Sequence, residues 1–422
     1  MVKMHNRLLA LILTIVWVMV GSISAQDTEP SAELLEQFET LETFTRETRG
    51  LDEAGTFNIV FPSRDDLAAY LETALREELA PEYVAEAMAF YAAFDFLPRD
   101  YDIVGAYESL YMAQVAGFYD PETKNMNVLL LTSDELGDKL PLLEQIIYVH
   151  EYVHTLQDMN FDLNAYMGEI ENVSYDEGLA RQALVEGDAT FVMSVYTAFV
   201  AQANPLGASL QLLLGGARTG TLTLPSDTPD ILGDELLFPY DAGQRFVSDI
   251  FDARGWDGVN RVFEEPPTST EQVLHPEKYL TNEYMPPIDL PDVSGSLGAG
   301  WQLVNEGRMG EFYLQRYLAT ILRNSVARTA AAGWGMDAFT IYENEANQQA
   351  WLLQLEWDTP EDEAEFLAAY DEFAAERFTE VLSEVGCWSD EVQVTCLSEA
   401  GTTLATAPTQ EMALMLLSEG DA

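Results

Sequence analysis

Apolar residues recur every three or four positions over several long stretches of this chain, which predicts a largely helical protein. Residues 64–116 carry this period and are broken near Pro81 and Pro98, so we expect consecutive helices there. Residues 140–159 are strongly helical in pattern, and a second long helix is expected over residues 175–200. Since that second helix is apolar nearly all round, we expect it to be buried.

Strand patterns are fewer and lie in two regions. Residues 117–131, GFYDPETKNMNVLLL, place two apolar stretches around a turn-forming cluster, which indicates a short hairpin or a bent edge strand. Towards the C-terminal end, the stretches AFTIYEN and QAWLLQLEW predict strands, followed by a helix at residues 360–383 and a hairpin that holds both cysteines. The predicted fold class is α+β: a mainly helical domain with a short edge strand or hairpin, followed by a smaller α+β portion.

The remaining stretches carry weaker patterns. Residues 26–50 are polar and acidic, and we expect them to be poorly ordered. Residues 201–239 are rich in Gly, Pro, Leu and Thr, which is typical of a long loop around short elements. Residues 266–280 are expected to be extended before a turn, whereas residues 307–325 follow a helical pattern. The chain therefore divides into four predicted regions: residues 1–25, 26–115, 116–295 and 296–422.

The first of these regions has the pattern of a secretory signal peptide. Lys3 and Arg7 precede an apolar run over residues 8–20, and small residues follow as far as Ala25. An uncleaved N-terminal anchor is the alternative, although the apolar run is short for a membrane span. We find no later segment that looks long and apolar enough to cross a membrane, so the mature protein is expected to be secreted or to lie at the cell surface.

The composition limits the partners of the protein. Its 72 acidic and 20 basic side chains give a net charge of −52, which predicts a solvated, repulsive surface and argues against nucleic acid as a partner. The two cysteines, Cys387 and Cys396, could close a small disulfide loop in an oxidising compartment. A zinc site built from them is the less favoured alternative, because no histidine lies nearby. The sequence does not indicate an oligomeric state.

The most specific chemical pattern is HEYVH at residues 150–154, in a chain with only four histidines. Residues four apart on a helix share one face, so His150 and His154 can both direct an imidazole nitrogen at one metal ion. Glu151, between them, can reach a water on that ion without binding the ion itself. The alternative is two surface histidines that share an ordinary helix.

A catalytic zinc ion needs three protein ligands and one open position. No third histidine lies close by, and Glu186 is a carboxylate on the second, apolar helix, where it is costly unless it is paired or bound to a cation. We therefore predict Glu186 as the third ligand, with Gly187 and nearby alanines letting its helix approach the motif helix. Two alternatives remain: an ion pair between Glu186 and Arg181 or another arginine, or Glu177 as the actual ligand.

Several other side chains are candidates for supporting roles. Asp158 lies one turn beyond the second motif histidine and could either orient a ligand histidine or cap a neighbouring loop. Asp188 points away from the predicted third ligand on the helical projection, so we leave it out of the metal site. His275, Tyr279 or Tyr240 could stabilise the oxyanion that forms when water attacks a carbonyl, although His275 could equally be structural. His275 precedes a proline, which predicts a non-helical backbone there.

The stretch HEYVHTLQDMNFDL, followed by ALVEGDATFVM, resembles the gluzincin metallopeptidases. It is more closely similar to a family of secreted or surface-anchored, mostly uncharacterised prokaryotic proteins with HExxH-xxxD and ALVEGDA motifs. GFYDPETK, PPTSTEQVLHPEKY and GWGMDAF…WDTPEDEAEF extend the similarity over most of residues 115–375. The resemblance implies a zincin-like core with His150, His154 and Glu186 as zinc ligands and Glu151 as general base. The interval between His154 and Glu186 is longer than in thermolysin-like enzymes.

These patterns together predict a secreted zinc-dependent metallopeptidase that acts on a peptide or protein substrate. Glu151 is the predicted base for a zinc-activated water, and the stretch NMNVLLL, if it is an edge strand, could pair with an extended substrate. An internal strand is equally consistent with that stretch. The alternative function is a surface binding or scaffold protein with a structural or inactive zinc site, and a non-peptidase hydrolase is a third possibility.

Overall fold

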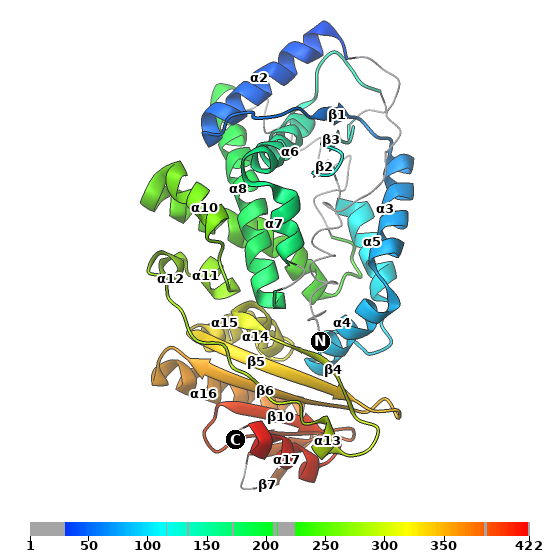
Figure 1. Ribbon diagram of the computed structural model, residues 1–422, viewed down its shortest axis with the longest axis vertical. Coiled ribbons are helices and arrows are strands. Elements are labelled where there is room, and N and C mark those ends of the chain that lie inside the picture. Colours follow the sequence, from blue (N-terminus) through cyan, green and yellow to red (C-terminus); the bar gives the residue numbers. More distant parts are fainter. Residues whose placement is uncertain are drawn as a thin grey trace.

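The protein forms a helical part stacked on a C-terminal sheet in one elongated molecule (Figure 1). The computed structural model describes residues 30–420 except residues 115, 133–134, 171–172, 206–208, 210–223 and 384–385. The predicted signal peptide, residues 1–25, lies outside the described residues. The predicted α+β fold class, with a mainly helical portion followed by a smaller α+β portion, is confirmed.

The helical part is organised around one long buried helix. Its helices are α2 (Ala32–Arg49), α3 (Arg64–Glu78), α4 (Pro81–Ala93), α5 (Ile103–Gln114), α6 (Leu142–Phe161), α7 (Leu163–Ile170), α8 (Tyr175–Ala203), α10 (Asp230–Glu264), α11 (Thr270–Leu274) and α12 (Pro276–Leu280). Helix α8 packs against both α6 and α10, which confirms its prediction as a buried helix. By length and composition α8 could cross a membrane, contrary to our expectation that no later segment could, but here it is a core helix.

The N-terminal acidic stretch is a helix rather than a poorly ordered segment, so that prediction was wrong for the residues described. Ser31 caps α2 by accepting a hydrogen bond from the Leu34 N–H, and Gly50 ends the helix in the left-handed conformation at φ 71°. The acidic composition hid a buried stripe with helical spacing: Leu34, Phe38, Leu41, Thr45 and Arg49. Packing of this stripe against α6 and α8 orders the helix.

Two further expectations fail in the helical part. Residues 230–239, predicted as part of a long loop, belong to α10, which tolerates Pro239 in its interior. Residues 266–280 are not extended but contain α11 and α12, with His275 between them at φ −127° and ψ 77°. The prediction that His275 itself is non-helical is confirmed, because the following proline starts a new short helix.

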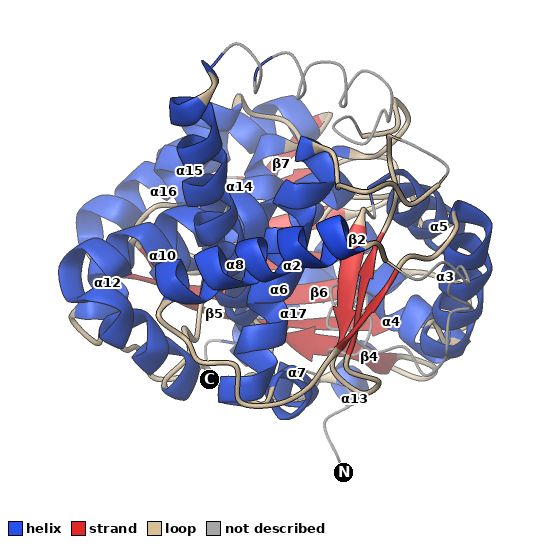
Figure 2. Ribbon diagram, turned by 90° about the horizontal axis from the view of Figure 1, so that it is seen from above, coloured by secondary structure: helices blue, strands red, loops and turns tan. Residues whose placement is uncertain are grey.

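A small sheet lies between the α6–α8 pair and helices α3–α5 (Figures 1 and 2). Its strands are β1 (Asn58–Val60), β2 (Gly117–Asp120) and β3 (Asn125–Val128), in the order β1-β3-β2. The predicted hairpin is confirmed, since β2 and β3 pair antiparallel. The stretch NMNVLLL contributes the central strand β3, not an edge strand, because β1 pairs with it on the other side. Strand β2 is therefore an edge strand of this sheet, and it contacts α6.

The C-terminal portion is a seven-stranded antiparallel sheet in the order β4-β5-β6-β10-β9-β8-β7. The strands are β4 (Gln302–Gly307), β5 (Trp334–Glu343), β6 (Gln349–Trp357), β7 (Glu380–Ser383), β8 (Cys387–Ser389), β9 (Val394–Leu397) and β10 (Thr403–Ala407). Helices α13 (Ser294–Leu297), α14 (Gly310–Ala319), α15 (Asn324–Ala331), α16 (Pro360–Arg377) and α17 (Gln410–Gly420) accompany it. The predicted helix at 360–383 ends at Arg377, and its last residues form β7 instead. The predicted cysteine hairpin is confirmed, with a Cys387–Cys396 disulfide across β8 and β9.

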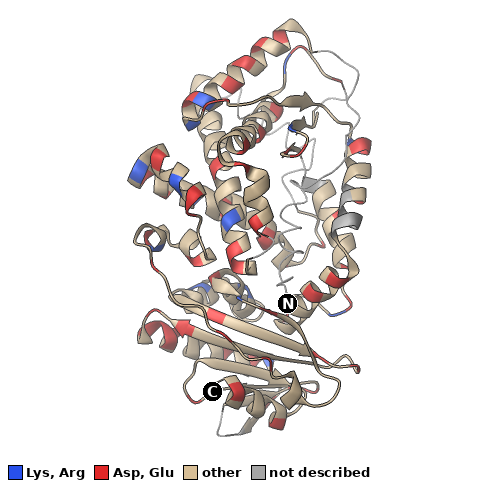
Figure 3. Cartoon of the chain, viewed as in Figure 1, with Lys and Arg blue, Asp and Glu red and all other residues tan. Residues whose placement is uncertain are grey.

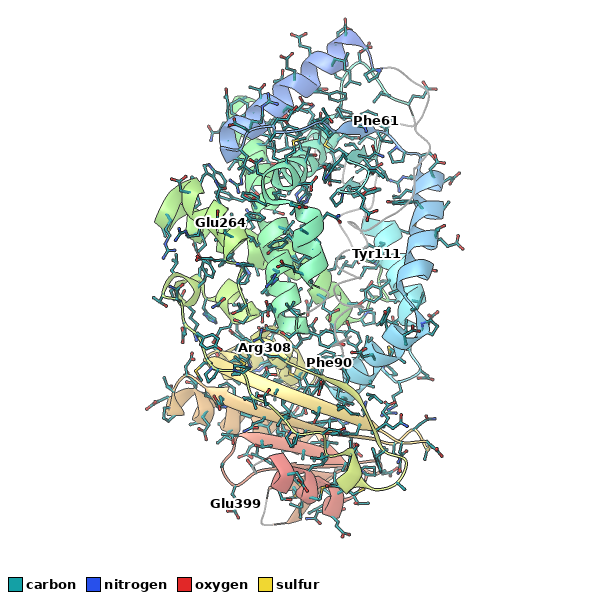
Figure 4. All side chains as sticks on the ribbon, in the orientation of Figure 1. Phe61, Phe90, Tyr111, Glu264, Arg308 and Glu399 are labelled. Carbon is teal, nitrogen blue, oxygen red and sulfur yellow. A yellow bond between two sulfur atoms is a disulfide. The ribbon has the colours of Figure 1, made fainter. Side chains whose placement is uncertain are left out.

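Alternation along β6 assigns each face of the sheet to a different core. Trp351, Leu353 and Leu355 belong to the main buried cluster that includes the helical part and α16. Ala350 and Leu352 face a smaller cluster with α17. Phe90 of α4 lies where the helical part meets the sheet (Figure 4), with ring centroids 4.8 Å from Tyr175 and 5.3 Å from Phe339. The main cluster thus includes side chains from both sides of the domain boundary predicted near residue 295. That boundary stays a prediction.

Candidate metal centre

Helix α6 brings the two motif histidines together in the interior. Four residues apart, His150 and His154 share one face, and their Nε2 atoms lie 3.0 Å apart. The two residues are only 8% and 2% exposed. The flanking residues Val149 and Val153 are buried in the main core, so the helix cannot rotate to release the histidines to solvent. Two surface histidines on an ordinary helix, the alternative interpretation, are therefore ruled out.

Helix α8 supplies the third member of the group. Glu186 Oε2 lies 3.1 Å from His150 Nε2 and 3.5 Å from His154 Nε2, and Glu186 is 2% exposed. One possible ligand atom from each of the three residues lies within 4.8 Å of the other two. The structure thus brings together the three residues predicted as metal ligands, from two helices that pack against each other.

The spacing of these atoms fits a metal ion. Tetrahedral zinc with bonds of about 2.0–2.1 Å separates its ligand atoms by roughly 3.3 Å, from simple trigonometry. The observed separations of 3.0, 3.1 and 3.5 Å lie around that value. Two imidazoles and one carboxylate, all buried, are a donor set suited to a divalent cation, and a cation there would balance the charge of the buried carboxylate. This group could therefore hold a metal.

The electrostatics of the two neighbouring glutamates differ. Burial alone raises the pKa of Glu186, but His154 and His150 outweigh burial and hold that pKa well below its usual range. Burial raises the pKa of Glu151 to about 8, and Glu186 adds to this effect while His150 opposes it. Glu186 therefore keeps its negative charge in the histidine pair, whereas Glu151 has a higher proton affinity.

Strand β2 packs directly against Glu151. The backbone N–H of Tyr119 donates a hydrogen bond to the Glu151 carboxylate. A Cβ atom on Gly117 would lie 3.1 Å from Glu151 Cγ and 2.9 Å from the Asn127 carbonyl oxygen, so only glycine allows this approach without adjustment. The edge strand thus orients the carboxylate beside the histidines.

Asp158 does not orient a ligand histidine. Its Oδ2 accepts a 2.7 Å hydrogen bond from the Tyr119 hydroxyl and lies 2.6 Å from Lys124 Nζ. Both partners come from the β2–β3 hairpin, so Asp158 ties that hairpin to α6. Asp158 could have oriented a ligand histidine or capped a neighbouring loop, and these contacts favour the second role.

The partner of His154 is Gln157, which we did not predict. His154 Nδ1 lies 2.8 Å from Gln157 Oε1, and Gln157 Nε2 donates to Asp188 Oδ2 at 2.9 Å. Arg49 of α2 donates to the same Asp188 oxygen at 2.9 Å. Gln157 lies three residues after His154 on the same helix, and this spacing was a signal for the contact between their side chains. No pattern along the chain pairs Arg49 with Asp188. Asp188 does lie outside the ligand group, as predicted.

The alternatives for the third ligand are excluded by other pairings. Glu177 Oε1 lies 2.7 Å from Arg181 Nη2, and Arg181 also reaches Glu169, so neither Glu177 nor Arg181 is at the metal group. The prediction for Gly187 was wrong, because this residue faces α10 and not α6. A Cβ on Gly187 would lie 2.2 Å from the Gly243 carbonyl carbon. The glycine pair lets α8 and α10 touch along their backbones.

The structure does not bring His275 to this group. His275 follows the last residue of α11, and its Nε2 lies 3.0 Å from Glu311 of α14. Asp176, which accepts from the Thr270 N–H of α11, is ten residues before Glu186, or about 15 Å along the helix. Tyr279 is also occupied elsewhere, since its hydroxyl donates to the Glu265 carbonyl oxygen.

Tyr240, the third candidate for oxyanion stabilisation, is at the site. Its ring is stacked on that of His150 with centroids 6.0 Å apart, and its hydroxyl is hydrogen-bonded to Glu186. Burial, together with the charge of Glu186, raises the pKa of Tyr240 well above its usual range, so the hydroxyl keeps its proton. Tyr240 is partly exposed, unlike the three buried residues beside it.

Comparison with known proteins matches the C-terminal portion. Residues 301–414, from β4 into α17, match a family model described as a domain of unknown function (DUF8575). A solved structure from Chloroflexus aurantiacus, described as a "putative hydrolase with a novel fold", is 15% identical with a TM-score of 0.34, over 66% of this chain and 96% of that chain. A likeness at this level assigns neither fold nor chemistry to this chain. No curated protein matches the sequence.

Proposed function

We propose that the protein is a zinc-dependent hydrolase of peptide bonds whose metal ligands are His150, His154 and Glu186. The observation that carries this proposal is the convergence of two imidazole nitrogens and one carboxylate oxygen within 3.5 Å, with a second carboxylate, Glu151, on the adjacent position of α6. A zinc ion held there would supply a Lewis acid that activates water near neutral pH. The resemblance of HEYVH and ALVEGDA to gluzincin motifs supports zinc as the metal.

Glu151 is the general base in this proposal. The charge of a bound cation would lower the pKa of Glu151 and keep it ionised, so that its carboxylate can accept the proton of the attacking water and then pass it to the leaving amine. The hydrogen bond from the Tyr119 backbone and the close contact with Gly117 hold the carboxylate in one orientation. A fixed base avoids the cost of reorganising it during the reaction.

Of the three candidates His275, Tyr279 and Tyr240, Tyr240 takes the oxyanion role in this proposal. Its protonated hydroxyl lies beside Glu186, and Tyr240 is partly exposed, unlike the three proposed ligands. A hydroxyl donor at this position stabilises negative charge that develops on the substrate oxygen. His275 is engaged with Glu311 and remains a structural residue in this proposal.

The proposed setting is outside the cytoplasm, with peptides or proteins as substrates. The Cys387–Cys396 disulfide supports an oxidising compartment, as does the signal-like pattern of residues 1–25. Acidic side chains are spread over the helices and the sheet, and basic ones are few (Figure 3). This distribution supports the expectation that nucleic acid is not a partner.

A second candidate is a surface binding or scaffold protein in which the metal is structural. The observation that favours it is burial: His154 and Glu186 are each 2% exposed, which is more typical of a closed site than of an open one. The two candidates differ in whether the metal keeps a position that water can occupy.

The experiment that tests the proposal combines metal analysis with cleavage of a peptide library by the purified mature protein. Wild type is expected to bind one zinc ion and to cleave, and Glu151→Gln to bind zinc equally well without cleaving. Glu169→Gln, at an exposed glutamate of α7, is the matched control and should behave as wild type. Zinc binding without cleavage by wild type would favour the scaffold function, and equal cleavage by Glu151→Gln would remove that residue from its role.

A further inference from the structure

The orientation of the Gln157 amide follows from its three partners. Gln157 Nε2 donates to the Val185 carbonyl oxygen at 3.1 Å and to Asp188 Oδ2 at 2.9 Å. Because both of these oxygens can only accept, the amide nitrogen must face them and the amide oxygen must face His154. The 2.8 Å contact between Gln157 Oε1 and His154 Nδ1 therefore requires a proton on Nδ1.

This proton decides which nitrogen of His154 can bind a metal. With Nδ1 protonated, the neutral ring keeps its lone pair on Nε2, the atom that lies 3.0 Å from His150 Nε2. His150 has no comparable support among the described residues, where its buried Nδ1 lacks a hydrogen-bond partner. His154 is thus the ligand whose tautomer and ring orientation the protein specifies.

The far end of this chain of contacts is a buried ion pair. Arg49 and Asp188 are both 0% exposed, and Arg49 Nε lies 2.7 Å from Asp188 Oδ1. Arg49 Nη1 also donates to Asn260 Oδ1 at 2.8 Å, and the guanidinium lies 4.5 Å from the centre of the Trp256 ring. Burying two charges is often no more stabilising than well-packed apolar residues, so stability alone does not account for this pair. The pair holds Asp188 as the acceptor for Gln157.

We propose that Arg49, Asp188 and Gln157 are positioning residues that set the tautomer and orientation of His154 for metal binding. This inference rests on the proposed metal site and adds helix α2 to the parts of the protein that support it. Arg49 is the last residue of α2, so the N-terminal helix is a permanent part of the metal-binding structure. Loss of α2 should therefore weaken metal binding.

The test uses Co²⁺ as a spectroscopic probe alongside Zn²⁺ affinity, both measured on the full mature protein. Gln157→Leu removes the acceptor for His154 Nδ1 and should lower the affinity for both metals by roughly 10–100-fold. The visible absorption of the Co²⁺ form should also change, because the His154 ring is no longer held in one orientation. Arg49→Met should act in the same direction although Arg49 does not touch either histidine, and Arg49→Lys should retain more of the affinity.

Arg46→Met is the matched control on the same helix. Arg46 lies 3.0 Å from Glu53 Oε2 and donates to the Tyr152 hydroxyl at 2.9 Å, so it also ties α2 to α6 but does not lead to a ligand histidine. We expect unchanged metal affinity and an unchanged Co²⁺ spectrum in this variant. If α2 only anchored the fold, Arg46→Met and Arg49→Met would both lower stability and neither would change the spectrum.

Arg49→Met leaves Asp188 buried without a cation, which could prevent folding. The double variant Arg49→Met/Asp188→Leu removes both charges while still depriving Gln157 of its acceptor. It should fold, as judged by circular dichroism, and bind metal more weakly; if it does not fold, Gln157→Leu alone decides. Failure of wild type to bind Zn²⁺ or Co²⁺ would overturn the metal site itself. Normal binding by wild type, with the same affinity and spectrum in Gln157→Leu, would overturn only the positioning role.

Discussion

His150 Nε2 and Glu186 Oε2 lie 3.1 Å apart, although 36 positions separate the two residues in the chain. The contact exists because α6 and α8 pack side by side in the core, and α8 is in turn held by its contact with α10. Atoms that share a metal ion tolerate little change in their spacing. The proposed metal site therefore depends on helix packing at positions that carry no metal-binding chemistry.

Gly187→Ala tests this dependence. The added Cβ would lie 2.2 Å from Gly243 of α10, so α8 must move and carry Glu186 with it. We expect a loss of stability of about 1–3 kcal/mol from overpacking. Zinc affinity should fall as well, measured by competition with a chelator. Gly168→Ala in α7, where nothing lies within 4 Å of the new Cβ, should leave metal affinity unchanged.

Removal of the Glu186 carboxylate should weaken zinc binding directly. Glu186→Gln keeps the shape of the side chain but removes the charge that balances the ion. The affinity, measured by calorimetry, should fall by more than the roughly 10–100-fold expected for loss of an outer partner. Glu177→Gln, at the glutamate paired with Arg181 on the same helix, should bind zinc as wild type does. Equal affinities in the two variants would contradict the assignment of Glu186.

Loss of the disulfide should destabilise the protein without touching the metal site. Cys387 and Cys396 close a short loop, with a sequence separation of 9, for which loop entropy gives about 2–3 kcal/mol. The β8–β9 hairpin lies in the part of the sheet far from α6 (Figure 1). Replacing both cysteines by serine should therefore lower the unfolding temperature while zinc affinity stays constant. A parallel fall in affinity would show that the sheet and the metal site are coupled.

Stability should depend on pH through Glu235 of α10. Burial raises the pKa of this carboxyl to about 8, although the hydroxyl of Tyr91 donates to both of its oxygens at 2.9 Å. Between the unfolded pKa of about 4.3 and the folded value, the native state binds a proton that the unfolded state has released. This group therefore makes stability fall as pH rises through that window, by up to about 1.4 kcal/mol per pH unit.

Glu235→Gln should remove this share of the pH dependence. Its free energy of unfolding, from denaturant titrations between pH 5 and pH 8, should fall less steeply with pH than that of wild type. Glu264→Gln changes an exposed glutamate of the same helix and serves as the control, with an unchanged slope. An identical slope in Glu235→Gln would show that Glu235 is ionised in the native protein across this range.

Local patterns were enough to predict much of the candidate site. The 3.6-residue period over residues 140–159 predicted α6, and the i, i+4 spacing then placed His150 and His154 on one face. Glu186 was recognisable because a lone carboxylate on an apolar helix needs a counter-charge. Each of these inferences uses only residues within one helix, where geometry follows from the backbone repeat.

Predictions failed where they relied on composition, or where contacts with a distant segment of the chain determined the structure. Residues 32–49 were expected to be poorly ordered because they are acidic, yet their buried stripe packs on α6 and α8 and forms α2. His275 was one of three candidates for the oxyanion donor, but its side chain lies beside Glu311 of α14. A role that chemistry requires does not by itself select which histidine or tyrosine fills it.

The order of residues in the chain thus specifies the helices, the histidine pair and the acid that joins it, because these depend on periodicity and on the cost of burying charge. The identity of the remaining partners depends on packing in three dimensions. Gly187 faces α10, Gln157 donates to Asp188, and Arg49 of α2 donates to the same aspartate. Contacts between segments far apart in sequence are set by how whole helices fit together, and no single segment carries that information.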